Sequence, residues 1–282
     1  MTLSYKQKII IKFILILEFL INNQFILPFH MLISVIYKWL YFKSDKKLSK
    51  TNFLLDDIKL DFKHYYNLRQ TGTALKNMNL VFICDGNRRW FKKNKDSFFN
   101  TYSDIKMIGL YKINEMVKYC YLEGCDSASF YVLGIRNLKR GGIVTEMIDY
   151  IKNIDVLDLP VKIRFYGNIE LLKDEKLVSK IEEIERRSLN SDFNDKSFKV
   201  NLFFVYNYSD CDQDVNNKRL YFNDQVDMII RTSGEKRLSD FLARQVSNGT
   251  AVEFIDTYWP DLQLSQLYLL GQKYLLEEVY LN

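Results

Sequence analysis

One short stretch of the chain places a carboxylate, a glycine and two arginines directly after an apolar run. Residues 80–90 read Leu-Val-Phe-Ile-Cys-Asp-Gly-Asn-Arg-Arg-Trp. The carboxylate of Asp85 would suit Mg²⁺ binding or proton transfer, and the guanidinium forks of Arg88 and Arg89 suit phosphate. Gly86 allows a sharp turn and a close approach of backbone amides to a ligand. We therefore predict a diphosphate site here, with an ordinary surface turn as the alternative, since Asp-Gly-Asn is also typical of turns.

The same stretch predicts the local structure that would present these groups. An apolar run over 80–83 that meets a turn signal is typical of a buried strand. A helix that begins near Asn87 would direct its free N–H groups, and the positive end of its dipole, at a ligand above Asp85. The carboxylate and the helix end would then face the same bound anion.

A second group of cations follows an expected strand at 226–230. Residues 231–241 read Arg-Thr-Ser-Gly-Glu-Lys-Arg-Leu-Ser-Asp-Phe. Arg231 would stand at the carboxyl end of the strand, and Arg237 and Ser239 at the start of a helix. Two guanidinium groups, a hydroxyl and helix N-terminal amides that converge there would form a second diphosphate site. A charged surface turn is the alternative.

A third strand end carries Arg136-Asn137-Leu138-Lys139-Arg140. Strands are expected at 80–83, 127–133, 161–166, 198–205, 226–230 and 251–255, and helices at 105–122, 145–151, 172–187, 238–246 and 263–280. This alternation predicts an α/β fold with an about six-stranded, mostly parallel sheet flanked by helices. Ligands of such sheets bind outside the carboxyl ends of the strands, so the three cationic strand ends would surround Asp85.

Composition excludes several classes of function. Lys and Arg number 40 against 35 Asp and Glu, and the net charge of +5 is too mild to indicate nucleic-acid binding. The cysteines show no close metal-ligand spacing, which favours reduced thiols in a core; they are Cys84, Cys120, Cys125 and Cys211. The two histidines, His30 and His64, lie away from the arginine motifs. A histidine-based catalytic apparatus is therefore not expected.

The N-terminal part is of a different character. Residues 9–21 and 25–42 are strongly apolar but are interrupted by Lys12, Glu18, Pro28, His30 and Lys38. No charge-free run reaches the roughly 18 residues of a confident transmembrane helix. We expect 1–50 to be a membrane-associating segment that lies at the interface, 51–78 to be a linker with amphipathic character, and 79–282 to be the catalytic domain. An amphipathic helix pair packed on the domain or on a partner is the alternative.

The motifs together resemble the cis-prenyltransferases, the undecaprenyl and dehydrodolichyl diphosphate synthases, and the eukaryotic catalytic subunit most of all. The motifs occur in the family's order, with DGNRRW at 85–90, NLKR at 137–140, IRTSGEKRLSDFL at 230–242 and WPD at 259–261. The likeness covers about 79–274. The resemblance implies Mg²⁺-dependent elongation of farnesyl diphosphate by cis additions of isopentenyl diphosphate. The implied product is a long-chain, dehydrodolichyl-type polyprenyl diphosphate for dolichol and glycan-carrier synthesis.

The resemblance also implies residue roles. Asp85 would coordinate Mg²⁺ and assist departure of the allylic diphosphate, and Asn137 would lie near the reacting centre. The allylic diphosphate would be held by Gly86, Asn87, Arg88, Arg89 and Arg140. Isopentenyl diphosphate would be held by Arg231, Arg237 and Ser239.

Some positions depart from the family's pattern. Gly134 and Arg136 stand where the family has Ser and Glu, and Lys106 falls where it has the His of a Gly-His motif. The printed chain ends without the family's Arg-x-Gly motif, so a partner subunit is expected to supply one. The expected location is the endoplasmic reticulum membrane, with the catalytic domain facing the cytosol. The alternatives are a weakly active or non-catalytic subunit of such a complex and an unrelated phosphate-binding α/β protein.

Overall fold

A computed structural model describes the chain over 75–94, 102–140, 145, 148, 151, 161–189, 198–211 and 216–280. The predicted membrane-associating segment 1–50 and most of the linker 51–78 lie outside these residues, as does most of the helix expected at 145–151. Those assignments stay predictions. Within the described part of the chain, no helix has the length and apolarity needed to cross a bilayer.

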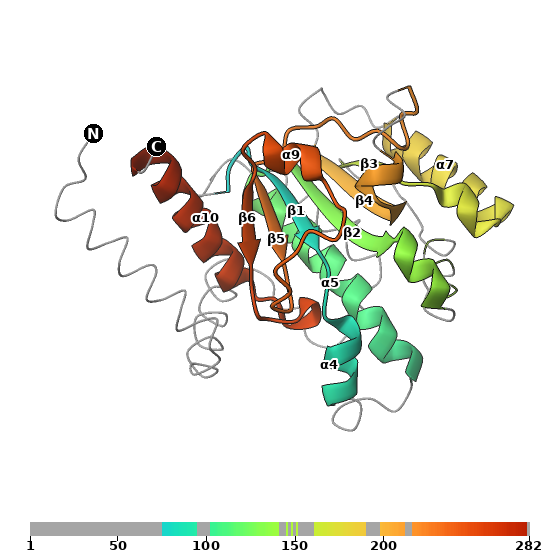
Figure 1. The fold of residues 1–282 in the computed structure, drawn as a ribbon, viewed down its shortest axis with the longest axis horizontal. Coiled ribbons are helices and arrows are strands. Elements are labelled where there is room, and N and C mark those ends of the chain that lie inside the picture. Colours follow the sequence, from blue (N-terminus) through green and yellow to red (C-terminus); the bar gives the residue numbers. More distant parts are fainter. Residues whose placement is uncertain are drawn as a thin grey trace, which may run out of the picture.

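Six parallel strands form a single sheet in the order β3-β4-β2-β1-β5-β6 (Figure 1). The strands are β1 (Asn79–Ile83), β2 (Ser127–Gly134), β3 (Val161–Tyr166), β4 (Phe198–Tyr206), β5 (Met228–Arg231) and β6 (Ala251–Phe254). Every ladder is parallel. The predicted fold class is therefore confirmed. Because β1 lies between β2 and β5, the chain changes side at β1, and such a switch point is where open α/β sheets bind ligands.

Helices flank the sheet and were largely predicted. They are α4 (Asn87–Asn94), α5 (Tyr102–Leu122), α7 (Glu175–Leu189), α8 (Tyr208–Cys211), α9 (Ala243–Ser247) and α10 (Leu264–Tyr280), with 3₁₀ turns η2 (Ile135–Arg140), η3 (Ile169–Leu172) and η4 (Trp259–Asp261). Helix α4 begins at Asn87, as expected, and lies beyond the carboxyl end of β1 (Figure 1). The loop predicted to bind a diphosphate and the N-terminus of α4 therefore meet at the switch point.

The helix expected at 238–246 is wrong in its first half. Residues 233–242 form a loop, and α9 begins only at Ala243. Ser239, Asp240 and Leu242 have φ angles of 58°, 60° and 47°, which a right-handed helix excludes. Arg237 and Ser239 therefore do not lie at a helix N-terminus, and no helix dipole assists them.

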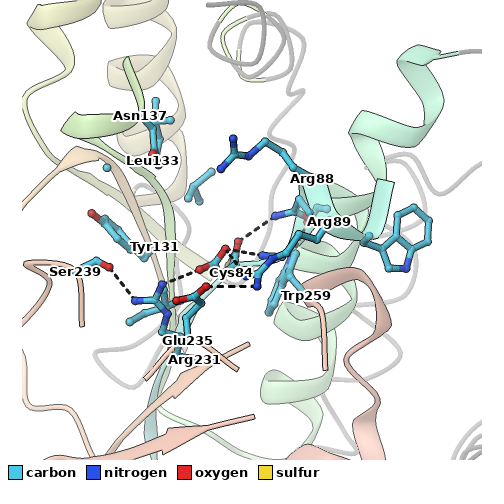
Figure 2. Close-up of a pocket in the computed structure, with 18 of the residues that line it drawn as sticks. Cys84, Arg88, Arg89, Tyr131, Leu133, Asn137, Arg231, Glu235, Ser239 and Trp259 are labelled. Atoms are coloured by element: carbon cyan, nitrogen blue, oxygen red, sulfur yellow. Dashed lines mark hydrogen bonds and ion pairs between the residues drawn. The ribbon is translucent and has the colours of Figure 1, made fainter. Parts of the chain in front are cut away.

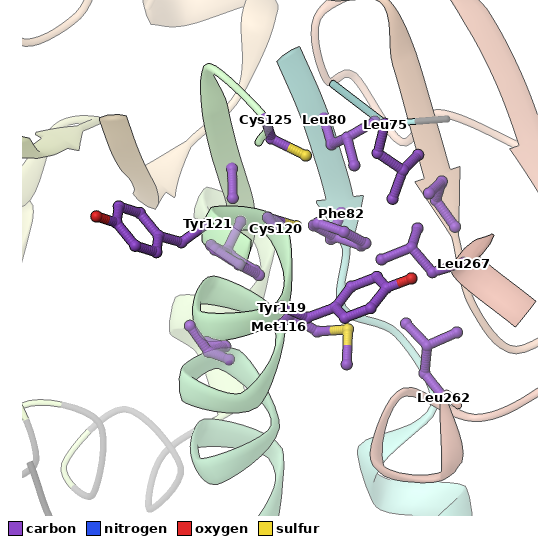
Figure 3. Packing of buried hydrophobic residues seen from close by; sticks show 14 of the residues in the cluster. Leu75, Leu80, Phe82, Met116, Tyr119, Cys120, Tyr121, Cys125, Leu262 and Leu267 are labelled. Carbon is purple, nitrogen blue, oxygen red and sulfur yellow. The ribbon is translucent and has the colours of Figure 1, made fainter. Parts of the chain in front are cut away.

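Apolar side chains cover both faces of β1. Leu80 and Phe82 pack in one core cluster with α5 and α10, whereas Val81 and Ile83 pack in a second cluster on the other face. Figure 3 shows Phe82 between the side chains of α5 and Leu267 of α10. The Phe82 ring stacks on Phe130 with 5.2 Å between centroids. A strand buried on both faces is a rigid support for the polar loop that follows it.

Gly167, directly after β3, tests how tightly this sheet is packed. Its φ angle is +130°, and a Cβ there would lie 2.0 Å from the carbonyl oxygen of Phe204. We expect Gly167→Ala to lower the free energy of unfolding by about 3 kcal/mol or more, because backbone strain adds to a clash with β4. Urea denaturation measures this loss. The matched control is Gly249→Ala, which has a φ of +97° but open space around its Cβ; equal losses in the two variants would refute the clash.

Candidate active site

A pocket of about 770 Å³ opens where the carboxyl ends of β1, β2 and β5 meet (Figure 2). The structure brings almost the whole predicted site into its lining, namely Asp85, Gly86, Asn87, Arg88, Arg89, Asn137, Arg231, Arg237 and Ser239. Arg140 closes η2, but its side chain lies outside the described part of the chain, so its role stays a prediction. Three separate strand ends therefore do converge on one pocket.

Arg231 joins the two predicted diphosphate sites. In the ladder between β1 and β5 it pairs with Ile83, which brings its side chain beside the Asp85 loop. Its Nη2 donates to Oδ2 of Asp85 at 2.7 Å, and its Nη1 donates to Oγ of Ser239 at 2.9 Å and to the carbonyl oxygen of Arg237. The Arg231 side chain is 3% exposed, whereas that of Asp85 is 34% exposed and open to the pocket. One buried guanidinium thus fixes both the carboxylate and the hydroxyl.

Glu235 lies between two other arginines. Arg89 Nη1 approaches Glu235 Oε1 at 3.4 Å, and the Arg237 guanidinium contacts the other carboxylate oxygen. The Nη2 of Arg89 donates to Ser233 Oγ at 2.6 Å and lies 3.7 Å from Asp85 Oδ1. Glu235 belongs to the motif at 230–242, and the sequence pattern predicts no role for it. This carboxylate is a counter-charge for cations from both predicted sites.

The Asp-Gly turn is fixed from the neighbouring strand ends. The backbone N–H of Asp85 donates to Thr232 Oγ1 at 3.0 Å, and its carbonyl accepts from the Thr232 hydroxyl and from the N–H of Trp259. Gly86 has a φ of +101°, and a Cβ there would lie 2.7 Å from a ring carbon of Tyr258. Position 86 therefore requires glycine, both for its conformation and for lack of space.

Helix α4 presents its N-terminus to the pocket. The side-chain amide of Asn87 donates to the carbonyl of Cys84 at 3.0 Å, and the first turn contains no acidic residue. The indole N–H of Trp90 donates to Asp261 Oδ1 at 2.7 Å and ties the helix to η4. The positive end of the dipole is therefore available to an anion. Burial, followed by the nearby Asp85 charge, raises the pKa of the Cys84 thiol, which stays protonated.

Tyr131, which no sequence pattern marked, lines the pocket together with Gly134. The Tyr131 hydroxyl donates to the carbonyl of Tyr206 at 3.0 Å. Burial, with the Asp240 carboxylate second, raises its pKa to about 12, so the hydroxyl stays a donor at neutral pH. A Cβ on Gly134 would lie 2.4 Å from that hydroxyl, so a larger residue there would displace the Tyr131 side chain. An aromatic residue in a strand looks like ordinary core, so no sequence pattern marked Tyr131.

Asn207 and Arg136 also line the pocket. Asn207 directly follows β4, and the rule that ligands meet strand ends would have found it. Arg136 lines the pocket from η2 and is exposed. It has no ion pair or hydrogen bond with the residues that the structure describes. A cation therefore stands where the family resemblance predicts Glu.

Apolar side chains form much of the remaining lining, which also includes Lys92 and Trp90. The apolar side chains come from α4, α5, β2 and η2, and they are Phe91, Leu110, Ile113, Val132, Leu133 and Ile135. The arrangement therefore combines a cationic cluster with an apolar wall. A molecule with a diphosphate head and an apolar chain matches both parts.

The carboxylates of the pocket fit Mg²⁺. No cluster of three or more His, Cys, Asp or Glu occurs among the described residues. Mg²⁺ in phosphate-processing sites is commonly held by one or two carboxylates together with substrate phosphates and water. Asp85, open to the pocket beside the arginines, supplies such a carboxylate, and Glu235 lies on the same wall.

The comparison with protein families decides the class. A family model described as putative undecaprenyl diphosphate synthase matches residues 83–212 and 207–278. The chain belongs to this family, the cis-prenyltransferases. It is a prenyltransferase of the type that the motifs at Asp85 and Arg231 predict, so the predicted enzyme class is confirmed.

Individual relatives agree with this assignment. The cis-prenyltransferase is 38% identical over 233 residues to a dehydrodolichyl diphosphate synthase of Encephalitozoon cuniculi, an alignment that covers 79% of this chain and 80% of the relative. It is 26% identical to a dehydrodolichyl diphosphate synthase complex subunit of Schizosaccharomyces pombe, over 71% of this chain and 85% of that one. The fold matches lavandulyl diphosphate synthase from Lavandula x intermedia, solved in complex with dimethylallyl diphosphate, with a TM-score of 0.57, 16% identity and coverage of 71% and 95%.

Proposed function

We propose that this cis-prenyltransferase condenses isopentenyl diphosphate onto farnesyl diphosphate and makes a long-chain, dehydrodolichyl-type polyprenyl diphosphate. Such a product would serve dolichol and glycan-carrier synthesis. The proposal rests on the guanidinium group of Arg231. One of its nitrogens donates to Asp85 and the other to Ser239, so it connects the two proposed diphosphate sites. The name of the Encephalitozoon cuniculi relative supports the class of product.

The allylic diphosphate would bind at the N-terminus of α4. Its carbon–oxygen bond breaks during the reaction, and the departing diphosphate gains negative charge. Arg88 and Arg89, with the amides of the helix end, lie where they would neutralise that charge. The apolar wall from α5 and β2 would hold the growing chain and exclude water from the carbocation-like centre.

Isopentenyl diphosphate would bind at Arg231, Arg237 and Ser239. Its double bond attacks the allylic carbon, and a proton is then lost to form the new double bond. The Arg231 fork would set the distance between the two diphosphates because it holds Asp85 with one nitrogen and Ser239 with the other. Asn137 lines the pocket from η2, in a position to orient the reacting groups.

Mg²⁺ is the proposed cofactor, with Asp85 as its protein ligand beside the substrate phosphates. When bound, the ion would supply charge neutralisation of the leaving diphosphate. Binding it would require the Asp85 carboxylate to share its contacts with Arg231 and Arg89. The one-third exposure of the Asp85 side chain leaves access for such an ion.

A partner and a membrane location complete the proposal. We propose a dimer with an accessory subunit that supplies a C-terminal Arg-x-Gly motif, at the endoplasmic reticulum membrane with the catalytic domain facing the cytosol. The name of the Schizosaccharomyces pombe relative, a complex subunit, supports the partner. The apolar composition of residues 1–50 supports membrane association. A non-catalytic subunit is disfavoured because Asp85 and both arginine groups remain together in one pocket.

Incorporation of labelled isopentenyl diphosphate tests the proposal. The full chain in detergent is incubated with farnesyl diphosphate and Mg²⁺, with and without a candidate accessory subunit. We expect long-chain product in at least one arm, and we expect chelation by EDTA to remove at least about 99% of the rate, because charge neutralisation of the leaving diphosphate is a term of several kcal/mol. Absence of product in both arms, from folded protein that binds both diphosphates, would identify a non-catalytic subunit.

A further inference from the structure

The loop that presents the second diphosphate site has an unfavourable backbone. Residues 239, 240 and 242 are not glycines, yet Ser239, Asp240 and Leu242 all have positive φ angles, of 58°, 60° and 47°. Side chains disfavour this left-handed region, so such a loop persists only where its surroundings hold it. Strain of this kind concentrates at functional sites, and here it brings the Arg237 carbonyl and the Ser239 hydroxyl onto Arg231.

The carboxylate of Asp240 fastens this loop to residues 207–209, which follow β4 and begin α8 and are called the turn after β4 below. Its Oδ1 accepts from the backbone N–H and the hydroxyl of Ser209, at 3.2 and 2.7 Å. Its Oδ2 accepts from the side-chain amide of Asn207 at 3.0 Å, and its backbone carbonyl accepts from the N–H of Tyr208 at 2.7 Å. Four hydrogen bonds from three consecutive residues therefore anchor a single strained residue.

The anchor is electrostatically favourable. Partial burial raises the pKa of Asp240, but the hydrogen bonds from Asn207 and Ser209 and the nearby charge of Arg136 outweigh it and leave the pKa below its ordinary value. Asp240 is therefore ionised throughout the neutral range and accepts hydrogen bonds as a carboxylate. Charge-assisted hydrogen bonds of this type are stronger than neutral ones.

The residue after Asp240, Phe241, is held in place by packing against aromatic side chains of the sheet. Phe241 is fully buried and stacks on Tyr131 with 4.1 Å between ring centroids. It also meets Phe203 edge to face, at 4.9 Å. The carboxylate anchor and the aromatic stack together leave Ser239 few alternative positions. Asp240 itself does not line the pocket, so it would act through its neighbours and not on the substrate.

We propose that Asp240 is a positioning residue, which holds Ser239 and Arg231 in the geometry that binds the second diphosphate by fastening the 233–242 loop to the turn after β4. This inference rests on the proposed function, because it assigns that loop to isopentenyl diphosphate. Loss of the carboxylate would release Ser239 from Arg231. It would leave the α4 end of the pocket, where the allylic diphosphate is proposed to bind, unchanged.

The test compares two variants with wild type in the incorporation assay. Asp240→Ala removes the acceptor and should raise KM for isopentenyl diphosphate at least about tenfold, with KM for farnesyl diphosphate within twofold. Ser209→Ala removes one of the four bonds outside the pocket and should shift the same KM by about threefold. Asp240→Asn keeps one acceptor and tolerates the left-handed backbone, so it should restore most of the affinity.

A structural control separates positioning from general destabilisation. Asp174 accepts a hydrogen bond from the N–H of Leu177 at the start of α7, far from the pocket lining. Asp174→Ala should lower thermal stability but change neither KM. If Asp240→Ala changes both KM values equally, or neither, the proposal is refuted. If Asp240→Ala fails to fold, the two KM values of Ser209→Ala test the proposal instead: a rise in the KM for isopentenyl diphosphate alone supports it, and equal changes in both or in neither refute it.

A binding measurement with inorganic pyrophosphate tests the role of Asp240 independently of whether the protein is an active enzyme. If wild type shows no turnover, the proposed function fails, and calorimetric titration with pyrophosphate then tests Asp240 alone. Weakening of at least fivefold in Asp240→Ala, with Asp174→Ala equal to wild type, would support the positioning role. Equal affinity in all three proteins would overturn it.

Discussion

Replacement of Arg231 by methionine is expected to lower kcat/KM for isopentenyl incorporation by about 10³-fold. The guanidinium is 3% exposed and contacts Asp85, Ser239 and the Arg237 carbonyl at once. Asp85 is itself partly exposed to the pocket, so the main loss is that of a preorganised charged donor, which costs about 3–4 kcal/mol, and each 1.4 kcal/mol of lost transition-state stabilisation is about tenfold in rate. Initial rates with saturating farnesyl diphosphate measure the loss.

A lysine at the same position shows whether charge or geometry matters. Arg231→Lys keeps the cation, but an ammonium group cannot reach Asp85 and Ser239 with a planar fork, so we expect a loss of about 10²-fold. The control is Arg187→Met on α7, which removes an arginine from an exposed pair with Glu183 and should leave the rate within twofold. A rate above one tenth of wild type in Arg231→Met would contradict the bridging role.

The sheet and most of the site could be predicted because their signals are local. Apolar runs that end in Asp-Gly-Asn or in Arg-Thr-Ser mark strand ends within a few residues, and a parallel sheet then brings those ends together. Asp85 and Arg231 are far apart in the chain yet meet at 2.7 Å, as the rule for strand ends implies. The pairing of the strands in the sheet is therefore enough to bring these two distant residues together.

The loop over 233–242 could not be predicted in the same way. The sequence pattern predicted a helix over 238–246 with Arg237 and Ser239 at its start, whereas α9 begins only at Ala243. Hydrogen bonds from Asn207 and Ser209, which come from a distant turn, override that preference. The helix propensity of residues 238–242 was therefore outweighed by long-range hydrogen bonds, which a local sequence pattern does not reveal.

Roles that depend on which groups meet were also out of reach. Glu235 was visible in its motif, but its position between Arg89 and Arg237 follows only from the folded loop. Gly134 was recorded as a departure from the family's serine. The structure explains it by the Tyr131 hydroxyl, which occupies the space of a side chain at 134. The glycine at position 134 and the Tyr131 side chain therefore pack against each other, and a change at one affects the other.

Replacement of Asp85 by asparagine is expected to separate chemistry from binding. The side chain keeps its shape, but the carboxylate that contacts Arg231 and Arg89, and that would bind Mg²⁺, is lost. We expect kcat to fall by about 10³-fold, since charge stabilisation of the leaving group is a term of several kcal/mol. Pyrophosphate binding without Mg²⁺ should be equal or tighter, because the pocket then carries one negative charge fewer. Initial rates and calorimetry measure the two effects.

Asp227→Asn provides the matched control because that carboxylate lies at the opposite end of β1. Its Oδ2 accepts from the backbone N–H of Asn79 at 2.6 Å, so the change affects the same strand without reaching the pocket. We expect somewhat lower stability and an incorporation rate within a few fold of wild type. If Asp85→Asn kept more than a tenth of kcat, or if it weakened pyrophosphate binding as much as Arg231→Met, the carboxylate would serve mainly to hold the arginines. Its assignment as metal ligand and catalytic group would then be wrong.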